Sequence, residues 1–283
     1  QKLPLHSIYV GPGRFRWGND IAVSPNNKTA ALALDGLFTV NLESGKSKKI
    51  AEAITLRGLS YSADGSKILT GTGPLEGNVA QIWDANNGSR IAEYETKSYV
   101  PKWSPDETKI LFPAHRTGKS AVIDIQSEKV TSFDHQGTPK MTQYGTFDRI
   151  GKKIITLSGD EKFNIWDIQN ENLLFTLNHG EAKDGSFGGS VAIFTPDNQK
   201  IISISNDLSV KLWDAANGNL LDTVNITKRN AINQAPKFSQ DGKRMIIPLQ
   251  NGSAYTGELE KNYAKLPNFL EPVPITEAFA FLA

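Results

Sequence analysis

Four histidines supply the imidazoles of this sequence, at His6, His115, His135 and His179. Hydrolytic chemistry needs a nucleophile with a base, a metal cage, or paired carboxylates in one pocket. None of the four has a histidine or carboxylate partner at metal-ligand spacing, and the sequence contains no Cys. Asp160 and Glu161 form an adjacent acidic pair, which we interpret as a structural Asp beside a solvated Glu. The sequence therefore predicts no catalytic residue, no metal site and no cofactor.

A second group of residues has the chemistry of partner recognition. Arg and aromatic side chains are enriched at binding hot spots, and here they precede apolar segments or lie in the loops between them. The group comprises Arg14, Arg16, Trp17, Arg57, Tyr99, Lys102, Arg116, Tyr144 and Phe187. We expect it to bind a protein or peptide partner, and packing between strands is the alternative for Trp17, Tyr144 and Phe187. The formal net charge is +1, so nucleic acid is not an expected partner.

The elements that would position these residues belong to a repeat. The dipeptide Trp-Asp occurs three times, at Trp83-Asp84, Trp166-Asp167 and Trp213-Asp214. Each copy ends an alternating apolar segment and precedes a polar turn, which is typical of a β-hairpin. Upstream lies a second turn phrase, such as Ser-Pro-Asp at 104–106, in which Pro fixes φ. Each unit then holds four antiparallel strands in about 40 to 45 residues, the period of propeller blades.

Six such units are readable, and we interpret all 283 residues as one β-propeller domain. The units span about residues 19–52, 56–95, 98–134, 141–178, 187–225 and 232–262. The ends, 1–18 and 263–283, resemble closing strands, so we expect them to share one blade and remove the exposed sheet edges. The sequence predicts an all-β propeller of four-stranded antiparallel blades, with seven blades favoured and six as the alternative.

With these motifs the chain resembles the WD-repeat (WD40-like) β-propeller family, as a divergent member. In that family a tetrad links a His, a Ser or Thr, an Asp and the Trp, so that buried polar groups satisfy one another. The resemblance implies two tetrads, His135, Ser158, Asp160 and Trp166 in the fourth unit and His179, Ser203 (or Ser205), Asp207 and Trp213 in the fifth. The first, third and sixth units lack Trp-Asp.

Taken together, the residues predict a non-enzymatic scaffold that binds a protein or peptide on the top face, around the central channel. This rests partly on family analogy, because a fold alone does not establish a function. Two alternatives stay open, a propeller hydrolase or lyase with a polar channel site, and a structural subunit of a larger assembly. Apolar runs stay short of the roughly 18 to 20 residues that span a bilayer, so we expect a soluble protein. Because the sequence begins with Gln1 and lacks Cys, we favour an exported bacterial protein, periplasmic or a lipoprotein without its N-terminus, over a cytoplasmic one.

Overall fold

A computed structural model describes residues 20–33, 36–52, 56–73, 77–96, 98, 100–113, 118–135, 144–158, 162–180, 190–205, 209–226, 235–239, 241–249, 251–260, 263–269, 272–274 and 277–278. Within these ranges the chain forms short strands of two to six residues. Buried and partly exposed residues alternate along strands such as Val79–Asp84, in which Ala80 and Ile82 are the buried ones. The alternation read from the sequence thus becomes a set of half-buried β-strands.

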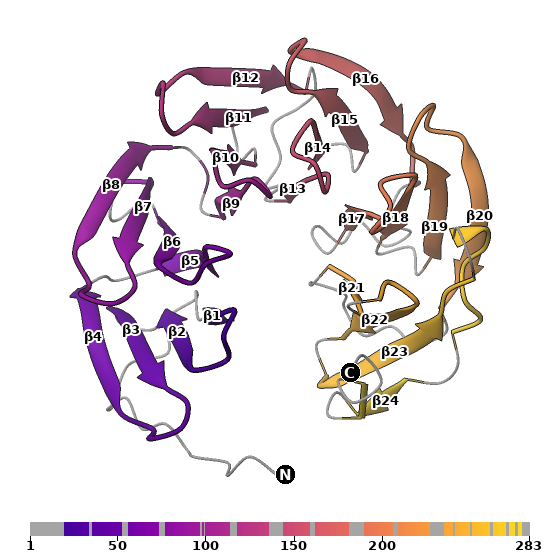
Figure 1. Cartoon of the computed structure of the whole chain (residues 1–283). Helices are drawn as coiled ribbons and strands as arrows, with labels where there is room; N and C mark the ends of the chain where they lie inside the picture. The colour runs from indigo at the N-terminus through magenta and orange to yellow at the C-terminus, as the bar shows by residue number, and fades with distance from the viewer. Residues whose placement is uncertain are drawn as a thin grey trace. The chain divides into compact units, whose positions relative to one another are not determined.

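The described strands form six four-stranded antiparallel sheets, each built from strands consecutive in the chain (Figure 1). The first two sheets contain β1 (Asp20–Val23), β2 (Thr29–Ala33), β3 (Gly36–Asn41) and β4 (Ser47–Glu52), then β5 (Leu56–Tyr61), β6 (Lys67–Thr72), β7 (Val79–Asp84) and β8 (Arg90–Glu95). The next two contain β9 (Lys102–Trp103), β10 (Lys109–Phe112), β11 (Lys119–Asp124) and β12 (Val130–Asp134), then β13 (Gly145–Phe147), β14 (Lys153–Leu157), β15 (Phe163–Asp167) and β16 (Asn172–Leu177). The last two contain β17 (Val191–Phe194), β18 (Lys200–Ile204), β19 (Ser209–Asp214) and β20 (Leu220–Asn225), then β21 (Lys237–Phe238), β22 (Arg244–Pro248), β23 (Ser253–Glu258) and β24 (Val273–Pro274).

The turn between the first two strands of a sheet is fixed by a hydroxyl side chain. In the second sheet Ser62 Oγ donates to Asp64 Oδ1 at 2.6 Å, and the N–H of Lys67 donates to Ser62 Oγ at 2.9 Å. Equivalent hydroxyl bonds are made by Ser24, Ser104, Thr195 and Ser239. Such turns let side chains replace backbone hydrogen bonds where the chain reverses. The Ser-x-Asp phrase of the sequence therefore sets the position of the first hairpin.

The turn after the third strand is fixed by the acidic residue that ends this strand. Asp214 Oδ1 accepts the N–H of Ala216 at 2.8 Å, and Asp84 Oδ1 accepts the N–H groups of Asn86 and Asn87. These backbone hydrogen bonds hold the pKa of both carboxyl groups below its ordinary value. The Asp of each Trp-Asp pair is thus a turn residue, while the residue before it faces the interior. We call that preceding residue the Trp position.

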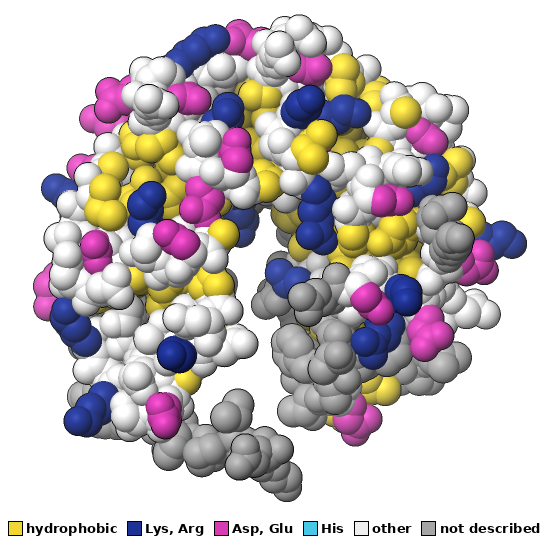
Figure 2. All heavy atoms as spheres, viewed as in Figure 1, with side chains coloured by type: hydrophobic (Ala, Val, Ile, Leu, Met, Phe, Trp, Pro, Cys, Tyr) yellow, Lys and Arg dark blue, Asp and Glu magenta, His cyan; other side chains and the backbone are white. Residues whose placement is uncertain are grey.

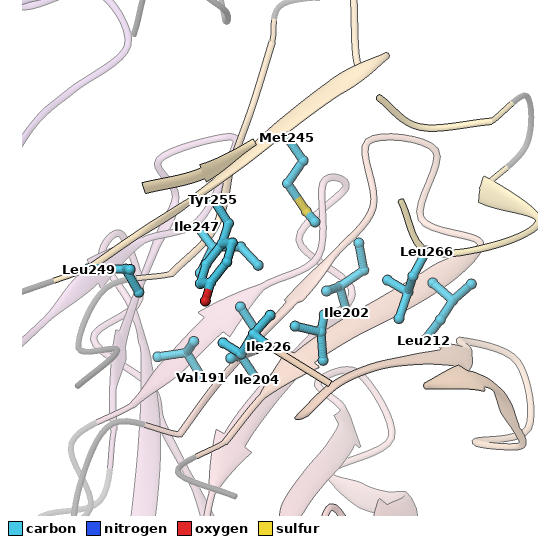
Figure 3. Packing of buried hydrophobic residues seen from close by; sticks show 11 residues of the cluster. Val191, Ile202, Ile204, Leu212, Ile226, Met245, Ile247, Leu249, Tyr255 and Leu266 are labelled. Carbon is cyan, nitrogen blue, oxygen red and sulfur yellow. The ribbon is translucent and has the colours of Figure 1, made fainter. Parts of the chain in front are cut away.

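Apolar side chains fill the space between the fifth and sixth sheets. Figure 3 shows one cluster of buried residues drawn from β18, β19, β22 and β23. Ile202, Leu212, Met245 and Tyr255 in this cluster are each at most 1% exposed. Leu266, which follows β23, completes it. Because burying one such side chain stabilises the fold by about 1.5 to 3 kcal/mol, the cluster holds these two sheets face to face.

Compact packing divides the chain into two units. One unit contains residues 1–112 and 122–129, and the other contains residues 113–121 and 130–283. The boundary between the units passes through the third sheet, because β11 contributes residues to both. The first two sheets therefore belong to the first unit and the last three sheets to the second.

The number of sheets corrects the favoured sequence prediction. We expected residues 1–18 and 263–283 to share a seventh, closing blade, but β24 pairs with β23 as the fourth strand of the sixth sheet. The physical reason is that the segment after β23 packs back on this strand, with the rings of Tyr255 and Phe269 6.2 Å apart. The described residues form six blades, which is the alternative that the sequence left open, and the closing segment expected at residues 1–18 lies outside them.

Candidate functional site

A buried hydrogen-bond network surrounds His179, which follows β16. The imidazole is fully buried, with Nδ1 2.6 Å from Ser203 Oγ and Nε2 2.8 Å from Ser209 Oγ. Trp213 Nε1 also donates to Ser203 Oγ, at 2.7 Å. Since an indole N–H only donates, the network is satisfied when Ser203 accepts from the indole and donates to Nδ1, which leaves Nε2–H to donate to Ser209. The structure brings His179, Ser203 and Trp213 together, and Asp207 lies outside the described residues.

The fourth sheet uses a different hydroxyl from the one that the resemblance implies. Trp166 Nε1 donates to Thr156 Oγ1 at 2.8 Å, whereas Ser158 Oγ donates to the carbonyl of Lys162 at 3.0 Å. The reason is register, because Thr156 and Ser203 each lie opposite the residue two places before the Trp. Ser158 follows the last residue of β14 and so lies farther along the chain.

His135, which follows β12, has its own buried partners. Its Nε2 lies 2.9 Å from Ser120 Oγ, and its Nδ1 lies 3.5 Å from Asn164 Nδ2. The ring of His135 packs edge-on against Trp166, with the ring centroids 5.7 Å apart. His135 and Trp166 are therefore in contact, while Asp160 lies outside the described residues.

A hydroxyl beneath the indole recurs in the second sheet, where Trp83 Nε1 donates to Thr70 Oγ1 at 3.0 Å. The sequence motifs did not mark Thr70 or Thr156 for this role. The signal that finds them is positional, because each is the fourth residue of a second strand that begins with Lys-Ile. Ser203 occupies the same place in the strand Lys200–Ile204. The acceptor is thus set by its place in the strand.

Most residues of the predicted partner-binding group lie outside the described part of the chain. These are Arg14, Arg16, Trp17, Tyr99, Arg116 and Phe187. Of the other three, Arg57 is described only by its backbone in β5, Lys102 begins β9, and Tyr144 directly precedes β13. Only these last three residues of the group are placed by the structure.

Tyr144 packs between the fourth and fifth sheets. Its hydroxyl donates to the carbonyl of Ala192 in β17 at 2.6 Å, and its ring packs against buried clusters of the fifth sheet. Burial raises the pKa of the Tyr144 phenol above its ordinary value. The structure therefore shows Tyr144 packed between strands, which was the alternative to partner binding for this residue.

Arg57 and Lys102 lie on neighbouring strands of the first unit, β5 and β9. A register shift within β5 begins just after Arg57 and contains Gly58. Gly58 has φ of +62°, and a Cβ at this position would lie 2.7 Å from the Cα of Val100. Only glycine permits this approach of two backbones. The bulge places the Arg57 backbone beside the segment that leads into β9.

A pocket of about 460 Å³ lies against the fourth sheet. It is lined by Asp134 and His135 at the end of β12, and by Asn164, Trp166 and Thr176 of β15 and β16. The lining therefore combines hydrogen-bonding and charged side chains with one indole. No sequence motif marked this pocket, because it depends on which side chain stands at one register position of the third strand.

Charges of both signs are mixed on the described surface. Lys and Arg lie interspersed with Asp and Glu over the face shown in Figure 2. Opposite charges pair within sheets, as between Lys200 and Asp214 at 3.3 Å and between Lys119 and Asp134 at 3.2 Å. Among the described residues, no three of His, Cys, Asp and Glu are grouped so as to hold a metal ion. Nor does any helix in these ranges have the length and apolar character needed to cross a membrane.

Comparison with known proteins gives two similarities. No family model matches the sequence. The chain is 26% identical over 284 residues to the Tol-Pal system protein TolB of Wolinella succinogenes. The aligned region covers 96% of this chain and 56% of TolB. It thus spans little more than half the length of that relative. It also resembles the C-terminal WD40 domain of Sif2, with a TM-score of 0.64 and 21% identity over 84% of this chain and 66% of that one. The sheet order, the recurring Trp position and this likeness identify the fold as that of a divergent WD40-like β-propeller.

Proposed function

We propose that the chain is a non-enzymatic scaffold that binds a protein or peptide partner at the loops leading into its inner strands. The proposal is supported mainly by the observation that polar side chains of the sheets form hydrogen bonds within the framework. The imidazole of His179, the hydroxyl of Thr156 and the carboxylate of Asp214 are all bonded within the framework. Groups held in this way stiffen a support, whereas a catalytic group must be directed at a substrate. A stiff support with variable loops suits partner binding.

Two comparisons support the proposal at the level of fold. The likeness to a WD40 domain gives the architecture, although one fold hosts many functions. TolB is by name a protein of the Tol-Pal system, and its similarity extends over nearly all of this chain. A protein that works within a system of components needs binding surfaces, so we extend this kind of role to the present chain.

The proposed binding group is the one predicted from the sequence, apart from the packed Tyr144. It consists of Arg14, Arg16, Trp17, Arg57, Tyr99, Lys102, Arg116 and Phe187. Arg57 and Lys102 belong to neighbouring strands of one unit, which is compatible with a shared binding surface. An acidic or aromatic segment of a partner would suit such a group.

Charge reversal tests this surface. The partner is first identified by affinity purification from the native source, and capture is then measured with the triple variant Arg16→Glu, Arg57→Glu and Arg116→Glu. We expect capture to be lost with an unchanged melting temperature. The matched control reverses three exposed charges elsewhere, Lys28→Glu, Lys46→Glu and Arg90→Glu, and should capture normally. Intact capture by the first variant would overturn the proposed surface.

An exported location is a second part of the proposal. It is supported by the absence of Cys and by the similarity to a Tol-Pal system protein. Fractionation of the native source tests it, and recovery of the protein in the cytoplasmic fraction would contradict it.

A further inference from the structure

The pocket on the fourth sheet occurs where three sheets differ at one position. Asn164 lies opposite Thr156, the residue that receives the indole N–H of Trp166. In the fifth sheet the same position is held by Lys211, opposite Ser203. The position is therefore two residues before the Trp, on the strand face that carries the indole. In the second sheet it is occupied by a third residue type, Gln81.

In the fifth sheet the chain fills this place with its own lysine. Lys211 Nζ donates to the carbonyl oxygen of His179. The same ammonium group lies 6.0 Å from the ring centroid of Trp213, within the range of a cation–π contact. An alkylammonium group is thus held between a backbone carbonyl and an indole, and the methylene chain covers the surface between them.

In the second sheet the position carries a neutral side chain. Gln81 Nε2 donates to Glu93 Oε2 on the adjacent strand β8, at 2.8 Å. The side chain is therefore directed along its own sheet. Of these two long side chains, Lys211 lies beside its indole, and Gln81 is bonded to the next strand of its sheet.

In the fourth sheet the side chain at this position, Asn164, is too short to extend beside the indole as Lys211 does in the fifth sheet. Asn164 Oδ1 accepts from Thr176 Oγ1 at 2.8 Å, and Asn164 Nδ2 lies 3.5 Å from the imidazole of His135. These bonds hold the amide close to the strand. The pocket of about 460 Å³ is lined by Asn164, Trp166, His135 and the Asp134 carboxylate.

We propose that this pocket binds the ammonium group of a lysine side chain presented by a partner. The fifth sheet shows that this framework holds such a group, and the His135 ring contacts Trp166 as the His179 ring contacts Trp213. The pocket adds a carboxylate, because Asp134 lines it. The ion pair of Asp134 with Lys119 leaves both side chains more than half exposed, so an incoming ammonium group can compete with Lys119 for the carboxylate.

Lys162 also lines the pocket and favours a different ligand, a carboxylate. The fifth sheet decides between the two, since at the equivalent place it holds an ammonium group beside the indole. The proposal rests on the proposed function insofar as a protein partner presents the lysine, but it concerns another surface. The triple arginine variant leaves all pocket residues in place, so loss of capture by that variant and loss of lysine binding here are separate results.

Titration with Nα-acetyl-L-lysine amide, followed through the indole N–H signals in a two-dimensional NMR spectrum, tests the proposal. We expect a saturable shift of the Trp166 signal, assigned with Trp166→Phe, and no comparable shift with Nα-acetyl-L-norleucine amide. Asp134→Asn should weaken binding by about tenfold. An equal response to the norleucine compound, a stronger response to Nα-acetyl-L-glutamate amide, or no response at all would overturn the proposal.

Two exchanged variants give the sharpest control. Asn164→Lys supplies the fourth sheet with the residue of the fifth, so its own ammonium group should fill the pocket and abolish the response of Trp166. Lys211→Asn should open the corresponding place and add a lysine-dependent shift of the Trp213 signal. Folding is checked by the melting temperature, and Asp134→Asn remains informative if Asn164→Lys does not fold. Binding that survives in folded Asn164→Lys, or silence of Trp213 in folded Lys211→Asn, would contradict the assignment.

Discussion

The fifth and sixth sheets occupy the Trp position in opposite ways. Trp213 lies opposite Ile201 in the fifth sheet, and Gly257 lies opposite Met245 in the sixth. In both sheets the partner is the second residue of the second strand, so the two positions are equivalent in register. One sheet therefore has the largest side chain at this place and the other has none.

The sixth sheet fills the place with a returning segment. A Cβ on Gly257 would lie 2.5 Å from the Cβ of Pro267 and 3.2 Å from Phe269 Cε1. The segment is held against the fifth sheet by the N–H of Leu266, which donates to Asp222 Oδ2 at 2.9 Å. The framework therefore requires the volume at the Trp position to be filled, and the indole with its hydrogen bond is one way of filling it.

The largest effect that we expect is the loss of the indole. Trp213→Ala should lower the free energy of unfolding by about 3 to 5 kcal/mol, because it removes a buried aromatic side chain that nothing replaces. Denaturant unfolding followed by circular dichroism measures the change. Leu220→Ala, at a position that is 50% exposed, is the control and should change stability by less than about 0.5 kcal/mol. A loss below about 1 kcal/mol for Trp213→Ala would contradict the role of the indole.

Removal of the shared hydroxyl should have the next largest effect. Ser203→Ala leaves both Trp213 Nε1 and His179 Nδ1 without this partner. We expect a loss of about 2 to 4 kcal/mol, since each buried group left unpaired costs roughly 1 to 3 kcal/mol. Ser158→Ala is the matched control, because its hydroxyl donates to the carbonyl of Lys162 and lies outside the register of the indole. Equal losses in equilibrium unfolding would show that the hydroxyl in register with the indole has no special role.

The sixth sheet should resist the opposite change. Gly257→Ala places a methyl group against Pro267 and should destabilise the fold by about 1 to 3 kcal/mol, the usual range for overpacking. The double variant Gly257→Ala with Pro267→Gly relieves the clash, so its loss should be smaller than the sum of the two single losses. Strict additivity in denaturant unfolding would argue against filling of the Trp position by the returning segment.

The repeating framework could be predicted from the sequence because its signals are local. The turn at Ser62 and Asp64 depends on residues two apart, and the Trp-Asp pairs mark the end of a third strand. The prediction of seven blades was wrong because β24 joins the sixth sheet through a segment packed where Gly257 has no side chain. That contact joins residues ten positions apart, and no repeat motif encodes it.

The candidate sites were less accessible to sequence analysis. The choice of Thr156 over Ser158 follows from strand register, which a two-residue error in alignment reverses. The pocket beside Trp166 depends on the length of Asn164 relative to Lys211, so it becomes visible only when the sheets are compared in register. The partner-binding group stays a prediction.

The smallest effect that we expect is that of Asp214→Ala, and its dependence on pH distinguishes a charged contact from the steric contact at Gly257. The backbone N–H of Ala216 and then the Lys200 side chain hold the pKa of Asp214 below 3.8. A lowered pKa in the folded state gives stability that is present above the ordinary value and is lost as pH falls through the folded value. At pH 6 the substitution Asp214→Ala should therefore lower the free energy of unfolding by its full amount, which we expect to be less than about 1 kcal/mol. This loss should shrink as the pH falls below 3.8. The clash in Gly257→Ala involves no proton, so its deficit should stay constant over the same range. If thermal unfolding gives Asp214→Ala an equally constant deficit, the ionised carboxylate does not stabilise the turn of the fifth sheet.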